Sequence, residues 1–410
     1  MPTTEAPIPE LQLDLIQTLA LAGLLYFTGM FLKRKIKLFE QLNIPSAVLG
    51  GLLFAAVNLI LHNRFLNIQS NTSMQSLCMM LFFTSIGTNA SVGLLKKGGK
   101  QVIVFLILSS AFCVIQNLAG IGVASLFGVS KLFGVMAGSV TLVGGPATGL
   151  AFSPLFEELG LKGAETIAIT SATFGIVFGG LLGGPVATFL IHKFHLQKET
   201  KKIVTRATTD WAETDETLGV DITHENSSFT MSLTNVVIII GLGSAVSFLI
   251  AKSGITLPSY IGAMIVGAVF RNINDKKEWM ILDQKVIDFA GGIALNIFLL
   301  IALMDLKLWE LSHLAGPLSA ILLTQVIVVI LFALSICFVL MGKNYESAVI
   351  SSGFIGFMLG TVANAMAVMK TVADKYGPAP KAFLVVPLVG AFFIDYINAL
   401  VITVFANILK

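Results

Sequence analysis

Long apolar stretches separated by short polar segments run through almost the whole chain. Most are about 20 residues long, which is the length that an α-helix needs to cross the hydrocarbon core of a bilayer. Because the stretches are continuous rather than alternating, they predict helices and exclude a transmembrane β-barrel. Ten of them are typical of complete spans: 13–32, 44–61, 74–95, 101–127, 167–191, 231–251, 257–270, 286–304, 313–341 and 382–409.

Two further apolar segments are interrupted near their middle. Segment 132–156 is broken by the run Gly-Gly-Pro-Ala-Thr-Gly at 144–149, and segment 346–369 is broken by small residues around Thr361 and Asn364. Helix-breaking backbone at membrane depth is tolerated only where it is buried in protein or lines a polar cavity. Each break is therefore a candidate part of a site, and each segment either crosses the membrane or turns back.

The lysines and arginines distinguish these two possibilities, because cytoplasmic loops carry an excess of them. If the N-terminus is outside and both broken segments turn back, 20 of the 26 basic residues lie inside. If both segments cross, the basic residues divide 13 to 13. The sequence therefore predicts two re-entrant hairpins, with both termini outside and the polar segment 192–229 in the cytoplasm. The basic residues left outside are Arg64, Lys131, Lys162, Lys252, Lys307 and Lys410.

The predicted fold is an all-α polytopic membrane protein with ten transmembrane helices plus two re-entrant hairpins in two inverted-topology repeats. Residues 1–191 form the first repeat, 192–229 a cytoplasmic linker and 230–410 the second repeat. Weak internal similarity at an offset of 215 places Gly145 on Gly360 and Gly149 on Asn364. Inverted repeats with broken helices at the bilayer midplane are typical of secondary transporters.

Composition narrows the class further. The chain is 55% hydrophobic and 12% charged, with a mean hydropathy of +0.88, whereas soluble domains carry about 25% charged residues. The lipid bilayer is thus an expected partner, and the net charge of +3 offers no support for nucleic-acid binding. The chain contains no zinc-spaced His/Glu pair, no G-x-S-x-G and no P-loop, so it is not expected to be an enzyme or an ATP-driven pump.

Asp395 is the carboxylate nearest the middle of any apolar stretch, and an ionisable residue at that depth is a functional hypothesis by default. Asn398 lies three residues later on the same helical face. Together they offer oxygen ligands for a sodium ion, and Asn117 and Asn89 are further amides at membrane depth that we assign to the same ion. The alternatives are a hydrogen-bonded structural aspartate and amides that join helices.

No lysine or arginine lies within the core of a span, so an anionic solute must be bound by other groups. Half-helix N-termini offer unpaired N–H groups and a positive dipole, and glycine lets the backbone approach closely. Alternatively, the glycines only permit tight helix packing. The predicted solute-binding residues are Gly144, Gly145, Thr148 and Gly149 from the first hairpin, Gly360, Thr361 and Asn364 from the second, and Asn398.

Several stretches closely resemble the bacterial sodium/glutamate symporter family. They are QNxxGIGxASL at 116–126, the first hairpin with TFGIVFGGLLGGPVA at 173–187, LKLWEL at 306–311, MGKNY at 341–345 and FLVVPLVGAFFIDYINALVI at 383–402. The resemblance implies sodium-coupled import of glutamate or a related acidic solute, with Na⁺ as the co-transported ion. It also implies an elevator-like mechanism, a homodimer and a place in the bacterial cytoplasmic membrane.

Both hairpin tips depart from the family pattern. Pro146 and Ala147 stand where the family commonly has His-Gly, and Thr361-Val362-Ala363-Asn364 stands where it commonly has Thr-Pro-Thr. Both changes fall at the predicted solute site. The alternatives to a glutamate symporter are therefore a sodium/2-hydroxycarboxylate carrier of the citrate or malate type and, from another class, a channel.

Overall fold

The computed structural model describes residues 9–41, 44–62, 64–93, 99–196, 225–253, 258–277, 279–307 and 315–410. This part of the chain is mostly helical. The short strands β1 (Glu10–Gln12) and β2 (Asn67–Gln69) pair in parallel. This pairing brings the start of the described chain beside the connection between the helices at 46–61 and 73–89. Most of the predicted linker, residues 197–224, lies outside the described residues.

Each predicted span overlaps a helix, or consecutive helices, of the described residues. By length and apolar composition alone, six helices of the described chain are able to cross a membrane, or seven if the last two helices count as one bent span. The helices are α1 (Leu15–Lys35), α2 (Lys37–Gln41), α3 (Ser46–Leu61), α4 (Ser73–Asn89), α6 (Gly99–Leu126), α7 (Lys131–Val135), η1 (Met136–Val140), α8 (Gly145–Glu158), α9 (Ala164–Lys193), α10 (Glu225–Lys252), α11 (Ser259–Lys277), α12 (Gln284–Met304), α13 (Ala315–Phe332), η3 (Ala333–Cys337), α14 (Phe338–Leu340), α15 (Tyr345–Leu359), α16 (Val362–Tyr376), α17 (Pro380–Phe392) and α18 (Ile394–Ile408).

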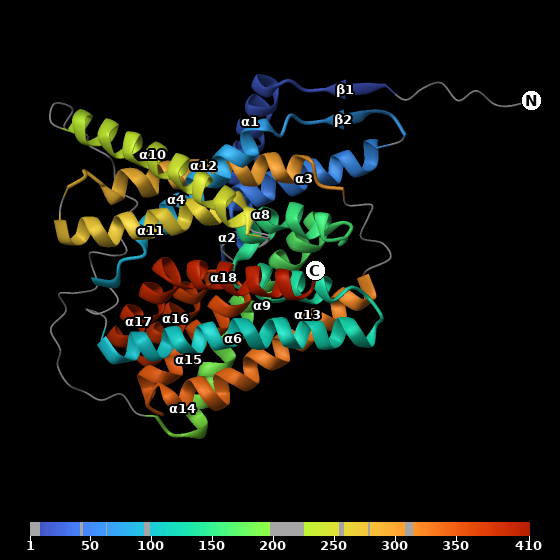
Figure 1. The fold of residues 1–410 in the computed structure, drawn as a ribbon. Helices are drawn as coiled ribbons and strands as arrows, with labels where there is room; N and C mark the ends of the chain where they lie inside the picture. Colours follow the sequence, from blue (N-terminus) through green and yellow to red (C-terminus); the bar gives the residue numbers. More distant parts are fainter. Residues whose placement is uncertain are drawn as a thin grey trace, which may run out of the picture.

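The long helices form two packed groups (Figure 1). The first group, which we call the scaffold body, contains α1, α3, α4, α10, α11 and α12. The second, which we call the hairpin body, contains α6, α7, α9 and α13 to α18, and α8 packs on α9 at its edge and also touches α12. Each body thus takes helices from both halves of the sequence.

Close contacts fix the direction of the scaffold helices. Phe83 of α4 stacks on Tyr260 of α11 with ring centroids 4.1 Å apart, and Ser91, just after α4, donates a hydrogen bond of 2.5 Å to Asp275 near the end of α11. The two contacts follow in the same order along both helices. Helices α4 and α11 therefore run parallel, with their C-terminal ends at the same end of the scaffold body.

The segment 346–369 is a helical hairpin. A methyl group on Gly356 of α15 would lie 2.9 Å from the Cα atom of Ala365 in α16, so the two arms pack closely on either side of the tip. The base is closed as well, because the backbone N–H of Ala382 donates to the Glu346 carboxylate at 3.0 Å, and the Tyr345 hydroxyl donates to the Gly377 carbonyl. The chain thus returns to the level at which it entered the hairpin.

In the segment 132–156, the break lies earlier than the sequence predicted. The backbone leaves helical geometry at Gly138 (φ −103°, ψ −132°), and α8 already begins at Gly145. The predicted break at 144–149 coincides only with the end of this interruption, at Gly144 and Gly145, because Pro146 lies in the first turn of α8, where its fixed φ favours helix and no N–H is needed. The first arm packs on α6 through Gly134 and Gly120, and α8 packs on α9 through Gly149 and Ala168.

The last predicted span, 382–409, is also not continuous. Helix α17 ends at Phe392, α18 begins at Ile394, and the two axes are bent by 46°. Asp395 lies in the first turn of α18, where a carboxylate interacts favourably with the positive end of the helix dipole. The bend places this residue at a helix end rather than along an unbroken helix.

Candidate functional site

The tips of the two broken segments meet. Gly145 is the first residue of α8, and Thr361 is the N-cap of α16. A methyl group on Gly145 would lie 4.0 Å from the Cγ2 atom of Thr361. Gly145 has a φ of +64°, a conformation that glycine adopts without the steric cost of a Cβ atom. The N-termini of two half-helices therefore converge on one point.

The second tip carries a buried amide. Asn364 lies in the first turn of α16, its Nδ2 atom donates to the carbonyl of Ile176 in α9 at 2.7 Å, and its Oδ1 atom has no hydrogen-bond partner. The Thr361 hydroxyl accepts a hydrogen bond from the Asn364 backbone N–H at 3.3 Å. The tip is thus anchored to α9 while one amide oxygen stays unpaired.

The same local contact occurs in both hairpins. A methyl group on Gly144 would meet the Oγ1 atom of Thr148 at 2.5 Å, and one on Gly360 would meet the Nδ2 atom of Asn364 at 2.6 Å. In each case a glycine makes room for a polar side chain four residues later. This contact relates the tips by an offset of 216, one residue more than the offset of 215 that the sequence comparison suggested.

Three buried polar side chains from three elements meet beside the first tip. The Asn117 Oδ1 atom of α6 accepts from the Ser139 backbone N–H at 2.9 Å, and the Asn398 Nδ2 atom of α18 donates to the Ser139 carbonyl at 2.9 Å. All three residues have no exposed surface. The Ser139 hydroxyl, the Asn398 Oδ1 atom and the Asn117 Nδ2 atom have no hydrogen-bond partner, which is costly for buried groups.

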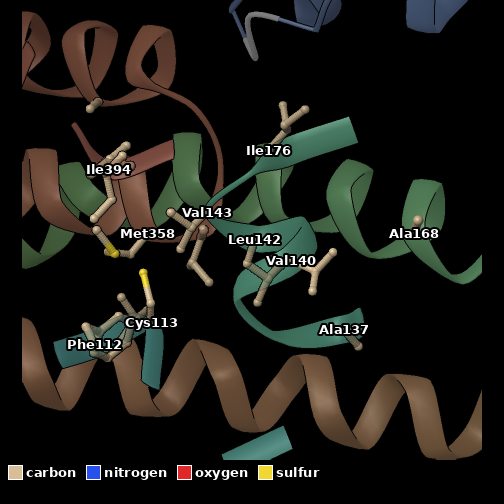
Figure 2. Packing of buried hydrophobic residues seen from close by; sticks show 14 of the residues in the cluster. Phe112, Cys113, Ala137, Val140, Leu142, Val143, Ala168, Ile176, Met358 and Ile394 are labelled. Atoms are coloured by element: carbon tan, nitrogen blue, oxygen red, sulfur yellow. The ribbon is translucent and has the colours of Figure 1, made fainter. Parts of the chain in front are cut away.

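A second buried chain of amides continues from this group. The Gln325 Nε2 atom of α13 donates to the Gln116 carbonyl at 2.7 Å, and the Gln116 Nε2 atom donates to the Met358 carbonyl at 2.9 Å. Both Oε1 atoms lack a partner. Figure 2 shows the apolar surroundings, with Cys113, Met358 and Ile394 close to the turn at Leu142 and Val143. The polar chain therefore crosses an apolar core and connects the two hairpins.

The sodium residues predicted from sequence divide into two places. Asn117 and Asn398 share Ser139, and Asp395 lies one helical turn before Asn398 on the same face. The half-buried Asp395 carboxylate accepts no hydrogen bond from any residue that the structure describes. Asn89 belongs to another group, because its Nδ2 atom donates to Asp288 of α12 at 2.7 Å in the scaffold body.

Sequence reasoning missed Ser139 and Gln325. Serine is common in packed membrane helices, and nothing in the local pattern marks Ser139 as different from the other serines. Its position follows from the unwound backbone at Gly138, which frees the Ser139 N–H to bond with Asn117. The Ser139 C=O accepts from Asn398 in addition to the backbone N–H groups of Val143 and Gly144. Only the three-dimensional arrangement identifies this residue.

Comparisons with known proteins agree with the resemblance seen in the sequence. The family model described as sodium/glutamate symporter matches residues 11–378. The sodium/glutamate symporter of Escherichia coli (strain K12) is 38% identical over 395 residues, which cover 96% of this chain and 97% of that protein. The sodium/glutamate symporter of Haemophilus influenzae is 39% identical over 394 residues, covering 95% and 96% of the two chains.

A solved structure of a sodium proton antiporter from Methanocaldococcus jannaschii is similar at 15% identity and a TM-score of 0.39, over 97% of this chain and 98% of that one. The family assignment rests on the family model and on the two relatives, which match nearly the full length of the chain. The chain belongs to the sodium/glutamate symporter family.

Proposed function

We propose that this protein is a sodium-coupled secondary symporter that imports glutamate through the cytoplasmic membrane of a bacterium. Family membership supports the activity. Within the chain, the observation that carries the proposal is the meeting of Gly145 and Thr361, because it places two half-helix N-termini at one point. Two positive helix ends facing each other form a site for an anion without a lysine or arginine.

The two negative charges of glutamate match the two positive helix N-termini that meet at the hairpin tips. One carboxylate is bound by the backbone N–H groups at the start of α8, and the other by those at the start of α16. The residues that line the two tips are Gly144, Gly145, Thr148, Gly149, Gly360, Thr361 and Asn364. The unpaired Oδ1 atom of Asn364 is an acceptor suited to the ammonium group of the solute.

Sodium binds beside the solute in this proposal. The Asp395 carboxylate, the Asn398 Oδ1 atom and the Ser139 hydroxyl supply the oxygen atoms, while Asn117 fixes the unwound backbone at Ser139. Unwound backbone at a broken helix is where secondary transporters coordinate sodium. The cation offsets the charge of the anion in a low-dielectric site, so each ligand raises the affinity for the other.

The helix directions support the proposed membrane topology. Between the C-terminal ends of α4 and α11, the chain contains four spans and the segment 132–156. The Ser91–Asp275 contact joins the two ends, and an even number of crossings between them supports the proposal that this segment turns back. Four spans and segment 346–369 lie between His192 and Tyr376, so their contact of 3.3 Å supports the same proposal for this segment.

We extend the proposal to the movement and to the assembly. The two packed bodies match an elevator-like mechanism, in which the hairpin body carries the solute across the membrane against a fixed scaffold body. The first three spans of each repeat form the scaffold body, as inverted repeats require. Two copies associate as a homodimer, with both termini outside and the linker 192–229 in the cytoplasm.

The test is uptake of labelled acids into proteoliposomes. An inward sodium gradient should drive accumulation of glutamate, and an equal potassium gradient should not. Citrate and malate serve as competitors, because the tip residues Pro146 and Ala147 leave a 2-hydroxycarboxylate as the rival solute. Accumulation of citrate or malate in preference to glutamate would refute the substrate, and flux without saturation or counterflow would indicate a channel.

A further inference from the structure

A cavity of about 590 Å³ lies between the scaffold body and the hairpin body. One wall is a single face of α11, formed by residues spaced three or four apart, and the opposite wall contains Phe393 and Tyr396 at the bend between α17 and α18. These two aromatic residues flank Asp395 in the sequence. The cavity is lined by Ala90, Val92, Ile265, Ala268, Val269, Asn272, Ile273, Lys276, Lys277, Phe393 and Tyr396.

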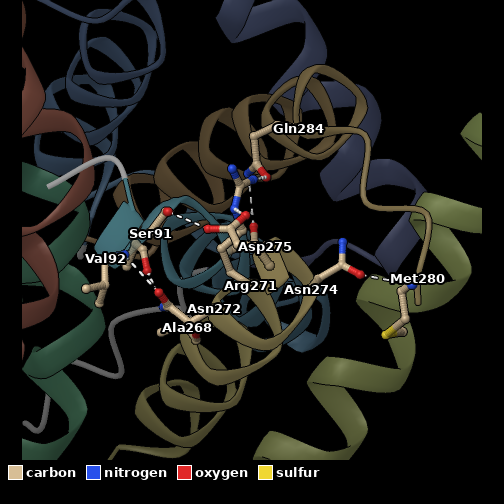
Figure 3. Close-up of polar contacts among 11 residues, drawn as sticks. Ser91, Val92, Ala268, Arg271, Asn272, Asn274, Asp275, Met280 and Gln284 are labelled. Atoms are coloured by element: carbon tan, nitrogen blue, oxygen red, sulfur yellow. Dashed lines mark hydrogen bonds and ion pairs between the residues drawn. The ribbon is translucent and has the colours of Figure 1, made fainter. Parts of the chain in front are cut away.

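Among the described residues that line this cavity, the charged side chains are Lys276 and Lys277, so their charge has one sign. Lys276 and Lys277 are exposed, and neither forms an ion pair with a residue that the structure describes. The neighbouring carboxylate of Asp275 is already engaged, because Arg271 contacts it at 2.8 Å and Ser91 donates to it at 2.5 Å (Figure 3). The two ammonium groups are therefore not neutralised by Asp275.

We propose that this cavity is the cytoplasmic vestibule of the transport pathway, and that Lys276 and Lys277 form an electrostatic funnel that attracts the acidic solute at its mouth. The position at the end of α11 is cytoplasmic in the proposed topology. The vestibule reaches the bend that carries Asp395, so solute and sodium leave their site on this side. The inference rests on the proposed function for the identity of the solute.

The composition of the walls fits passage rather than tight binding. Apart from Asn272, Tyr396 and the two lysines, the described residues that line the cavity are apolar. Apolar walls offer a dicarboxylate few hydrogen bonds, so a solute is not retained there. Low-dielectric walls also focus the field of the lysines, which raises the local concentration of anions and falls steeply with ionic strength. The funnel thus affects rates and apparent affinity on one side of the membrane.

The first experiment measures the charge preference of the cavity directly. Ile273→Cys puts a thiol on the cavity wall, three and four residues before the two lysines, at Cβ separations of about 5–6 Å. In inside-out vesicles, an anionic methanethiosulfonate reagent should react faster than a cationic one of similar size. The native cysteines Cys78, Cys113 and Cys337 are buried, and the protein without Ile273→Cys gives the background rate.

Removing the two charges should abolish this preference. In Lys276→Gln/Lys277→Gln, the ratio of anionic to cationic labelling rates should fall roughly fivefold or more at low salt and much less at 1 M salt. The matched control is Lys343→Gln/Lys370→Gln, which removes two exposed lysines from the same predicted side but not from the cavity wall. An unchanged ratio in the cavity variant, or an equal fall in the control, would refute the funnel.

Transport assays then test on which side of the membrane the cavity opens. In proteoliposomes of defined orientation, the cavity variant should raise the half-saturating internal glutamate concentration for exchange about 3–10-fold and leave the external half-saturating concentration unchanged. An equal change on both sides would overturn the assignment to the cytoplasmic vestibule. If the unmodified protein transports no glutamate, the proposed function fails, whereas the labelling result still decides whether the cavity is an anion funnel.

The lipid composition separates a solute pathway from a lipid site. The labelling ratio should be the same in vesicles of phosphatidylcholine and in vesicles that also contain phosphatidylglycerol. Labelling that is blocked only by phosphatidylglycerol would show that an anionic lipid occupies the cavity, and would overturn the proposal.

Discussion

Replacement of Asn398 by alanine tests the proposed sodium site most directly. The side chain is fully buried and makes one hydrogen bond, from Nδ2 to the Ser139 carbonyl at 2.9 Å, while its Oδ1 atom is free to bind a cation. Asn398→Ala removes the oxygen ligand and leaves the Ser139 carbonyl without this donor. Both effects act on the same unwound backbone beside the first hairpin tip.

The magnitude follows from these two losses. An interaction with a charged group contributes about 1.5–3 kcal/mol, and an ordinary intramolecular hydrogen bond contributes about 0.5–1.5 kcal/mol. The second loss has the smaller value because the Ser139 carbonyl still accepts from the backbone N–H groups of Val143 and Gly144. The loss of the hydrogen bond to Ser139 destabilises the protein both with and without bound sodium. Only the loss of the oxygen ligand therefore lowers the affinity for sodium. Since 1.4 kcal/mol corresponds to a factor of ten, the half-saturating sodium concentration should rise roughly 10–100-fold.

The assay is glutamate uptake into proteoliposomes at a series of sodium concentrations, with saturating glutamate. The matched control is Thr403→Val on the same helix, because Thr403 is buried and its hydroxyl bonds only within its own helix, to the Ala399 carbonyl at 2.8 Å. The control should keep the sodium dependence of the unmodified protein. A half-saturating sodium concentration that changes less than threefold in Asn398→Ala, in a folded protein, would refute the ligand assignment.

Three further changes have defined outcomes. Asp395→Asn should abolish or strongly weaken sodium coupling while the protein remains folded, and unimpaired sodium-driven accumulation would remove Asp395 from the site. Gly145→Ala should raise the half-saturating glutamate concentration several-fold, because φ is +64° at this tip and strain of about 1–3 kcal/mol results; Gly145→Asn, which tolerates this conformation better, should be milder. Gly175→Ala should lower the melting temperature because its methyl group would overlap the Leu359 carbonyl, whereas Gly184→Ala, which meets nothing within 4 Å, should be neutral.

The apolar stretches predicted the helices well, because every span needs about 20 apolar residues and the chain supplies them in order. They predicted the two broken segments for the same reason. They did not locate the break at Gly138, since a glycine among apolar residues has the same pattern in a continuous helix. They also missed the bend before Asp395, because the residues at the bend, Phe392, Phe393 and Ile394, are apolar and include no proline or glycine.

The contacts of the amides were the least predictable feature. Asn117 and Asn89 occupy similar positions in apolar stretches, yet one bonds Ser139 in the hairpin body and the other bonds Asp288 in the scaffold body. The bond between Asn398 and Ser139 joins residues 259 positions apart. Which amides meet depends on the packing of helices that are distant in the sequence, so the pattern of a single helix carries little information about it.

In the proposed mechanism, the buried polar chain connects the sodium site to the solute site. Gln116 and Asn117 are neighbours on α6, and Gln116 holds the Met358 carbonyl just before the second tip, while Asn117 holds the Ser139 N–H before the first tip. A cation that orders Ser139 therefore acts on an element that both hairpins share. Because linkage is reciprocal, a solute that draws the two tips together must also tighten the sodium site. Gln116→Leu should accordingly weaken the dependence of glutamate affinity on sodium more than it weakens glutamate binding at saturating sodium, and equal effects on both would contradict this coupling.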